Sequence, residues 1–316
     1  MVLERLGMPS AEPRVDSLGA TGYLAAEGFV PELRHELGET SAEFERLLLR
    51  RGEPIVAAWA QNVWLDPVRV RIGSIAEAAR SLRALGRNWA LYSSKLHRRA
   101  ALIQAELPHV GCRPLRFPAA PPAAPLGSWT LLDEHTLLAA ARCTSPFRHG
   151  EIELVEDHQA PPSRAYLKLW EAFTRLGRRP GPGERCLDLG ASPGGWTWAL
   201  QQLGAEVVAV DKAPLDPRIA ALPRVRFEQV SAFALEPGGL GPIDWLLCDV
   251  VCYPQALYRM VMRWLDAGAC SNLVCTIKFQ GETDHDVARR FAAIPGSSLM
   301  HLHHNRHELT WSKLAT

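Results

Sequence analysis

A glycine-rich turn between an apolar strand and a helix is the first part of the chain whose residue types suggest chemistry. Asp188 lies at the end of the apolar run, and Gly190, Gly194 and Gly195 follow within seven residues. Glycines let a backbone approach a ligand closely, and free N–H groups at a helix start attract a carboxylate or phosphate. Asp211 closes the next strand, where an acid can accept both hydrogen bonds of a ribose diol. Together they indicate a ligand that contains adenosine.

Two further polar side chains follow apolar strands. Asp249 follows the run WLLC, and Lys278 follows NLVCTI. The carboxyl ends of strands line the ligand crevice in open α/β sheets, so both residues are candidates for a site. The alternative is a structural glycine turn, a capping acid and a solvated lysine. A dinucleotide oxidoreductase is disfavoured, because Gly190 is followed by Ala and Ser and the spacing is not GxGxxG.

Strands and helices alternate from about residue 163 to the end of the chain, which predicts an α/β domain with a mostly parallel, doubly wound, Rossmann-like sheet. The predicted strands are 184–190, 205–211, 224–230, 243–250 and 272–279, followed by a possible antiparallel pair at 298–304 and 307–314. The predicted helices are 196–204, 254–268 and 286–294.

The first part of the chain predicts a smaller α+β domain. A strand ending near Gly28, a helix from Pro31, a strand within 53–66 and a helix over 75–86 alternate there. Four prolines within residues 118–125 indicate a stiff, extended spacer. We therefore expect an N-terminal domain at 1–125, a connecting segment at 126–162 and a Rossmann-like domain at 163–316.

Residues 69–99 carry positive charge, although the formal net charge of the whole chain is only +1. A basic stretch with interleaved aromatics, here Trp89 and Tyr92, suits RNA phosphates and exposed bases; a solvated helix face with core aromatics is the alternative. The basic residues are Arg69, Arg71, Arg80, Arg83, Arg87, Lys95, Arg98 and Arg99, with Arg113 and Arg116 beyond them.

Composition excludes several classes of protein. No run of 18 apolar residues exists, so we expect no membrane span, and the first residues lack the apolar stretch of a secretory signal. Seven cysteines without a CxxC pair, several in apolar runs, predict reduced thiols in a cytoplasmic protein. Four histidines at 301–307 lack a Cys or carboxylate at ligand spacing, so we expect no metal site.

The segment DLGASPGGWT…VDKAPLD resembles the cofactor loop of the FtsJ-type ribose 2′-O-methyltransferases. That resemblance implies S-adenosylmethionine as cofactor, RNA as substrate and a Lys–Asp–Lys–Glu tetrad. The motif beginning at Ser163 points to Lys168, and Asp249, Lys278 and Glu308 follow in the family's order. The implied cofactor-binding residues are Gly190, Ser192, Pro193, Gly194, Gly195, Trp196, Asp211, Ser231 and Asp249.

TSPF at 144–147 and the Ser163 motif are most similar to the branch of the family that methylates a cytidine ribose in bacterial 23S ribosomal RNA. The start of the chain is also similar to that branch, whose N-terminal region is a THUMP-like RNA-binding domain. The implied partner is 23S rRNA or its precursor, with no membrane partner, and the oligomeric state is not predicted. Ser231 departs from the family, which often has an acid there.

The chemistry of methyl transfer to a ribose suggests a role for each member of the tetrad. A 2′-hydroxyl must lose its proton as it attacks, and a lysine can accept that proton if burial and a neighbouring cation lower its pKa. We hypothesise that Lys278 is the base, that Lys168 positions the ribose and depresses the pKa of Lys278, and that Asp249 orients the lysine. The alternatives are methylation of another RNA, such as transfer RNA, and a non-catalytic RNA-binding or ribosome-assembly protein.

Overall fold

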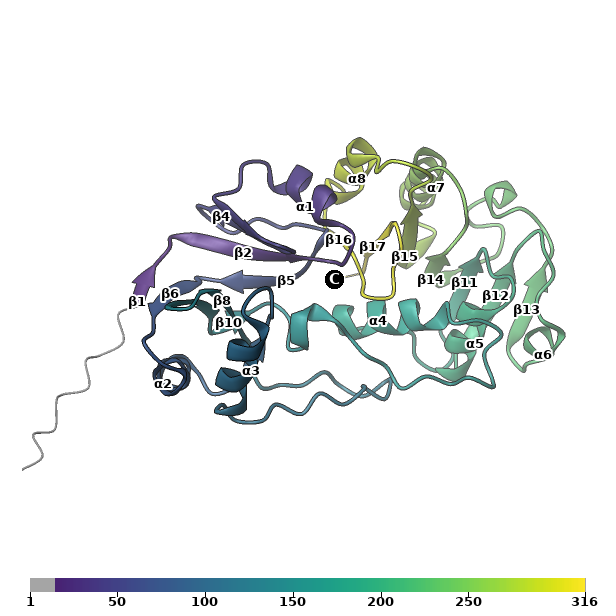
Figure 1. The fold of residues 1–316 in the computed structure, drawn as a ribbon. Helices are drawn as coiled ribbons and strands as arrows, with labels where there is room; N and C mark the ends of the chain where they lie inside the picture. Colours follow the sequence, from purple (N-terminus) through teal and green to yellow (C-terminus); the bar gives the residue numbers. More distant parts are fainter. Residues whose placement is uncertain (1–14, 316) are drawn as a thin grey trace, which may run out of the picture.

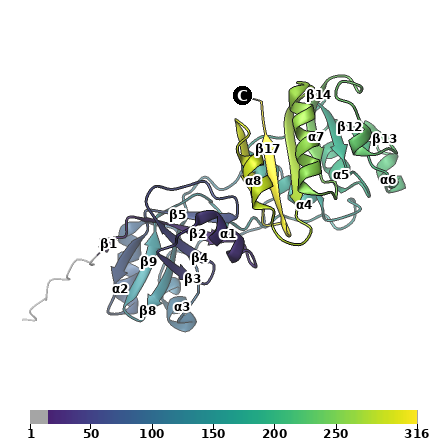
Figure 2. The same cartoon turned by 90° about the horizontal axis from the view of Figure 1, so that it is seen from above.

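The computed structural model describes residues 15–315. The first 14 residues, where the sequence predicts no secretory signal, and Thr316 lie outside this range. Figures 1 and 2 show an N-terminal unit of strands and short helices beside a unit built on one large sheet. Among residues 15–315, no helix has both the length and the apolar character that a membrane crossing needs.

The N-terminal unit contains two five-stranded sheets and three helices, which agrees with the predicted α+β class. The first sheet has the order β1 (Val15–Ser17), β6 (Val68–Arg71), β9 (Thr136–Ala140), β8 (Gly127–Asp133) and β7 (Trp89–Leu91). The second has the order β10 (Arg142–Cys143), β5 (Ala60–Leu65), β2 (Ala20–Ala25), β4 (Leu47–Arg51) and β3 (Ala42–Phe44). The helices are α1 (Val30–Leu37), α2 (Ile75–Leu85) and α3 (His97–Ala105).

Local sequence explains where these helices begin. Pro31 occupies the first turn of α1, where its missing N–H costs nothing. Ser74 caps α2 by accepting a hydrogen bond from the Glu77 N–H, and the Glu77 carboxylate accepts one from the Gly73 N–H. This reciprocal pair satisfies two backbone donors that the helix would otherwise leave without partners.

Residues 127–143 differ from the expectation that 126–162 connects two domains. They form β8, β9 and β10, and these strands pair within the two N-terminal sheets. Before the prolines, Leu115 packs against the core of the second unit and forms a bridge with Leu154, and the chain then returns to the first unit in β8. The proline-rich segment is therefore an excursion within the fold, because the chain goes back to the first unit after it.

The second unit has a seven-stranded sheet with the order β13-β12-β11-β14-β15-β17-β16. Strand β17 runs in the opposite direction to the other strands of this sheet. The predicted Rossmann-like α/β architecture is confirmed. Its strands are β11 (Arg185–Leu189), β12 (Glu206–Val210), β13 (Val225–Glu228), β14 (Ile243–Cys248), β15 (Cys270–Lys278), β16 (Ser297–Met300) and β17 (Glu308–Lys313). Its helices are α4 (Tyr166–Leu176), α5 (Gly195–Gln202), α6 (Pro217–Ala220), α7 (Pro254–Asp266) and α8 (His285–Ala292).

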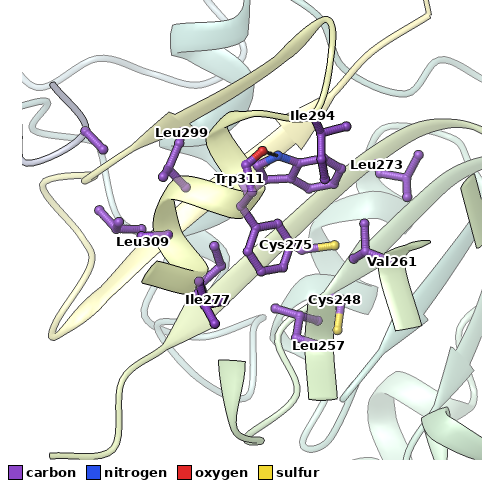
Figure 3. Close-up of a cluster of buried hydrophobic side chains, with 14 of the residues drawn as sticks. Cys248, Leu257, Val261, Leu273, Cys275, Ile277, Ile294, Leu299, Leu309 and Trp311 are labelled. Carbon is purple, nitrogen blue, oxygen red and sulfur yellow. Dashed lines mark hydrogen bonds between the residues drawn. The ribbon is translucent and has the colours of Figure 1, made fainter. Parts of the chain in front are cut away.

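Helices cover both faces of this sheet (Figure 1). Helices α4 and α5 pack on one face, and α7 and α8 pack on the other. Cys248, Cys275 and Trp311 lie in the core beneath α7 and α8 (Figure 3). Burial of long apolar runs on both faces is why these strands read as continuous hydrophobic segments in the sequence.

The two units share one core. Leu33 and Leu37 of α1 and Trp59 belong to the same buried cluster as the strands and helices of the second unit. The His301 N–H donates to the Ala58 carbonyl at 2.7 Å, which ties the segment after β16 to the N-terminal unit. The orientation of the two units is therefore fixed by buried contacts.

A substitution at Gly150 tests how closely the segment after β10 packs against β5. Its φ is +79°, and a Cβ at this position would lie 2.0 Å from the Gln61 carbonyl oxygen. We expect Gly150→Ala to lower the free energy of unfolding by roughly 3 kcal/mol or more, because the clash adds to the left-handed strain. Gly177→Ala is the control, since its φ is +64° with no atom within 4 Å of the added Cβ, and strain alone costs about 1 kcal/mol. Urea unfolding followed by tryptophan fluorescence checks this, and equal losses would contradict it.

Candidate active site

Three strand ends and one helix start bring the predicted tetrad together. Lys168 lies in the first turn of α4, Asp249 directly follows β14, and Lys278 is the last residue of β15. Glu308 begins β17 and is the direct register partner of Lys278 in the antiparallel pair. Because β14, β15 and β17 are adjacent, their side chains at this edge converge.

Asp249 contacts both lysines. Its Oδ1 lies 3.0 Å from Lys168 Nζ and 3.2 Å from Lys278 Nζ. Lys168 Nζ also lies 2.7 Å from Glu308 Oε1, and Lys278 Nζ donates to the Asp249 carbonyl oxygen at 2.6 Å. The four side chains are between 9% and 19% exposed, so these ion pairs are largely withdrawn from water.

The carboxylates determine the charge state of Lys168. Burial alone would lower the pKa of Lys168, but Asp249 and Glu308 outweigh it and raise the pKa above its ordinary value. Lys168 is therefore held as an ammonium ion. The two carboxylates and two lysines together can carry a formal charge of zero, which makes their joint burial tolerable.

The glycine turn lies against the loop that follows β14. Gly190 has φ +81°, and a Cβ there would lie 2.8 Å from the Val250 nitrogen. Any other residue would push these two loops apart. Asp211 then fastens the glycine turn to the loop after β12, since its carboxylate accepts from the Ser192 N–H at 3.0 Å and from the Ala213 N–H at 2.9 Å.

A cavity of 380 Å³ joins the glycine turn to the tetrad. Its volume is within the usual range for small-molecule sites. The predicted residues that line it are Gly190, Ser192, Asp211, Ser231, Asp249 and Lys278. Lys212, Phe233, Val250 and Val251 also line it and were not among the predicted residues.

The remaining predicted cofactor residues are not in the cavity lining. Trp196 is buried in the core and donates its Nε1–H to the Ala165 carbonyl at 2.9 Å. Gly194 and Gly195 lie where a Cβ would collide with Ile219 and with Ser163. The absence of a side chain at these two positions therefore lets the start of α5 pack closely against neighbouring segments. Pro193 follows Ser192 through a cis peptide bond.

Comparison with known proteins agrees with this geometry. The sequence profile described as FtsJ-like methyltransferase matches residues 161–284. The match covers 124 of the 316 residues of the chain. Lys168, Asp249 and Lys278 lie inside this matched FtsJ-like segment, and Glu308 lies beyond it.

The chain is also similar to curated proteins named Ribosomal RNA large subunit methyltransferase M. The protein from Halorhodospira halophila is 48% identical over 107 residues, covering 33% of this chain and 31% of the relative. The protein from Marinobacter nauticus is 32% identical over 206 residues, covering 57% and 55%. In these matches the chain spans between a third and about half of the length of its relatives.

Among solved structures, the 1,6-didemethyltoxoflavin-N1-methyltransferase of Burkholderia thailandensis is 21% identical. That match covers 48% of this chain and 77% of the other, with a TM-score of 0.34. A likeness this low carries no information about the ligand of this chain.

Asp188 is a fully buried acid in β11, two residues before Gly190 of the cavity lining. Burial raises the pKa of Asp188 to about 7, the negative charges of Asp249 and Asp211 act in the same direction, and the Thr197 hydroxyl, 2.6 Å away, opposes them. Its Oδ1 has no hydrogen-bond partner among the described residues. A cationic ligand in the cavity would therefore favour ionisation of this carboxyl.

Glu171 supports the site from behind and was not predicted as a functional residue. It lies one helical turn after Lys168, is fully buried, and accepts hydrogen bonds from the His303 and His304 N–H groups at 2.8 and 2.9 Å. Arg175 donates to the same carboxylate at 2.8 Å. Glu171 thus anchors the loop that leads to Glu308. Glu171 belongs to the Ser163 motif, three residues after Lys168, and this position was the sequence feature that could have identified it.

The pKa of Glu171 makes this anchor testable. Burial would raise the pKa of Glu171, but the His304 hydrogen bond and the nearby charge of Arg175 outweigh it and lower the pKa to about 2. A lowered pKa gives stability that is present above the ordinary value of 4.5 and is lost as the pH falls toward 2. The shift of 4.5 to 2 corresponds to roughly 3 kcal/mol.

We expect Glu171→Gln to be less stable than the wild type at pH 7 by an amount of this order, and the difference to shrink between pH 4.5 and 2. Thermal unfolding at several pH values measures both effects. Glu206→Gln, at an exposed position of β12, is the control. A difference between Glu171→Gln and wild type that stays constant from pH 7 to pH 2 would contradict the role assigned to the charge.

Proposed function

We propose that this chain is an S-adenosylmethionine-dependent RNA ribose 2′-O-methyltransferase that acts on a cytidine of 23S rRNA. The observation that carries the proposal is the shared Asp249 carboxylate, which contacts both Lys168 and Lys278 and lines, together with Lys278, the same cavity as Gly190, Ser192 and Asp211. The relatives named Ribosomal RNA large subunit methyltransferase M support the choice of RNA.

The cavity fits S-adenosylmethionine by size and charge. When bound, this cofactor supplies an electrophilic methyl group on a sulfonium centre. Asp211 lies where a carboxylate can accept from the ribose hydroxyls of the cofactor, and Ser231 lies beside it in the lining. The Asp249 carboxylate in the cavity lining provides negative charge for a sulfonium, and a sulfonium there would favour ionisation of the buried Asp188.

Lys278 is the base in the proposed reaction. Methyl transfer from the bound cofactor to the 2′-oxygen would release the hydroxyl proton, and Lys278 Nζ would accept it. A neutral lysine amine has two N–H donors, enough for its contacts with the Asp249 carbonyl and carboxylate, and its lone pair remains for the proton.

Lys168, Asp249 and Glu308 are positioning groups in this scheme. The raised pKa of Lys168 means that it stays protonated and can donate a hydrogen bond to the substrate ribose. Asp249 fixes the direction of Lys278, and Glu308 balances the charge of Lys168.

All seven cysteines are free thiols, which supports the cytoplasm as the compartment.

Replacement of Lys278 tests this assignment. We expect Lys278→Ala to lower the rate of methyl transfer by at least about 100-fold, the usual contribution of a general base. Lys278→Arg should lose a similar factor, because a guanidinium does not release its proton at neutral pH. Binding of S-adenosylmethionine, measured by calorimetry, should be retained.

Labelled methyl transfer onto ribosomal RNA from cells lacking this protein, followed by nucleoside mapping, is the assay. Lys313→Ala, at the far end of β17, is the control. Transfer to a base rather than a ribose would overturn the proposed reaction, and an active Lys278→Arg would overturn the role of Lys278.

The N-terminal unit, which we expect to be THUMP-like, is proposed to present RNA through α2, the loop after it, and α3. Arg80, Arg87 and Arg98 are exposed there, and none forms an ion pair with another described residue. Arg83 differs, because it donates to the Glu106 carbonyl at the end of α3 at 2.7 Å. The first three are therefore the better candidates for phosphate contacts.

Charge reversal at Arg80, Arg87 and Arg98 should weaken RNA binding and reduce its salt dependence, by a slope of about 1 for each phosphate that the variant no longer neutralises. RNA titrations at several salt concentrations measure both quantities. Arg179→Glu, on the exposed loop before β11, is the control. Unchanged affinity and slope in the triple variant would assign RNA binding to another surface.

A further inference from the structure

Tyr253 is unusual among the aromatic side chains of this protein. The chain contains 10 Trp, 5 Tyr and 9 Phe, all within the described residues. Tyr253 is the one aromatic side chain in the exposed class, with 66% of its surface accessible. Its ring makes no hydrogen bond or ring contact within residues 15–315, so the fold does not use it.

The position of Tyr253 links it to the site. It lies four residues after Asp249, so the two Cα atoms are at most about 14 Å apart. Val251, between them, lines the cavity and is 74% exposed. Val250, the residue before it, and Lys278 line the same cavity, which makes this loop a neighbour of Lys278.

Other contacts hold this loop in place at the mouth of the site. The backbone carbonyl of Tyr253 accepts the first hydrogen bonds of α7, from the Ala256 and Leu257 N–H groups. Gln255, in the first turn of α7, hydrogen-bonds Asp284 at the start of α8. The ring of Tyr253 is therefore presented to solvent from a fixed backbone.

We propose that Tyr253, with Val251 beside it, is a stacking platform for a nucleobase of the RNA substrate next to the reacting ribose. This inference rests on the proposed function. The base is attached to the ribose carbon next to the one that carries the 2′-hydroxyl, so a ribose at Lys278 places its base, or that of the adjacent nucleotide, near this loop. An exposed ring stacks on any base face, and recognition of unpaired RNA commonly uses such rings.

If Tyr253 is a stacking platform, RNA binding by the variants depends on whether the residue at 253 has an aromatic ring and not on whether it has a hydroxyl. Tyr253→Ala should raise the KM for RNA about 5- to 100-fold, the range that loss of one base–aromatic stack produces. Tyr253→Phe and Tyr253→Trp should stay near wild type, and the affinity for S-adenosylmethionine should not change in any of them. Val56→Ala, which truncates another exposed apolar side chain outside the cavity lining, is the control.

RNA substrates that lack a single base identify the nucleobase that stacks on Tyr253. Once the methylated nucleotide is mapped, RNA oligonucleotides abasic at that position, or at either neighbour, are compared for the wild type and Tyr253→Ala. The base that stacks is the one whose removal makes the two proteins bind equally. Equal sensitivity to Tyr253→Ala on all abasic substrates would overturn the platform.

Direct RNA binding, followed by fluorescence of 2-aminopurine in the oligonucleotide, separates the two proposals. If the wild type transfers no methyl group but Tyr253→Ala loses RNA affinity, the proposed reaction fails and the platform stands. If the wild type methylates RNA and Tyr253→Ala has the same KM, the platform fails and the proposed function stands. Equal defects in Tyr253→Ala and Tyr253→Phe, or a change in self-association without a change in RNA binding, would also overturn the platform.

Discussion

The candidate site depends on one carboxylate shared by two lysines. Burying two ammonium groups next to each other is costly, because each loses hydration and they repel. Asp249 lies between them and Glu308 adds a second negative charge to Lys168, so the cluster can be buried without a net charge. The same arrangement keeps Lys168 protonated, because the two carboxylates raise its pKa.

The sheet and α4 make this geometry rigid from two sides. Register pairing sets Lys278 opposite Glu308, and the adjacent β14 brings Asp249 to the same edge. Along α4, Lys168 and Glu171 lie on neighbouring turns and face the same way. Lys168 contacts the tetrad, whereas Glu171 holds the backbone of the loop leading to Glu308. A single helix therefore positions both partners of the Lys168–Glu308 ion pair.

The N-terminal unit is also part of this support. Trp59 packs near His301 and His307 with ring centroids 5.2 and 6.1 Å apart, and burial lowers the pKa of His301 to about 4, so His301 is neutral in this cluster. Thr283 contacts both His307, at 2.7 Å, and Glu32 of α1, at 3.4 Å. Since His307 precedes Glu308, the unit proposed to present RNA is packed directly against the start of the strand that carries Glu308.

The sequence by itself determined the strands of the second unit and its helices α5, α7 and α8, because long apolar runs and helical periodicity are local properties, and it determined the order of Lys168, Asp249, Lys278 and Glu308. Helices α4 and α6 were not among the predicted elements. Only the tertiary structure decided which residues meet. Strand order and the antiparallel register of β17 bring the tetrad together, and neither follows from local pattern. The same reason explains the differences: the pairing of β8 to β10 with distant strands, the burial of Trp196 and the exposure of Tyr253 are set by contacts between remote segments.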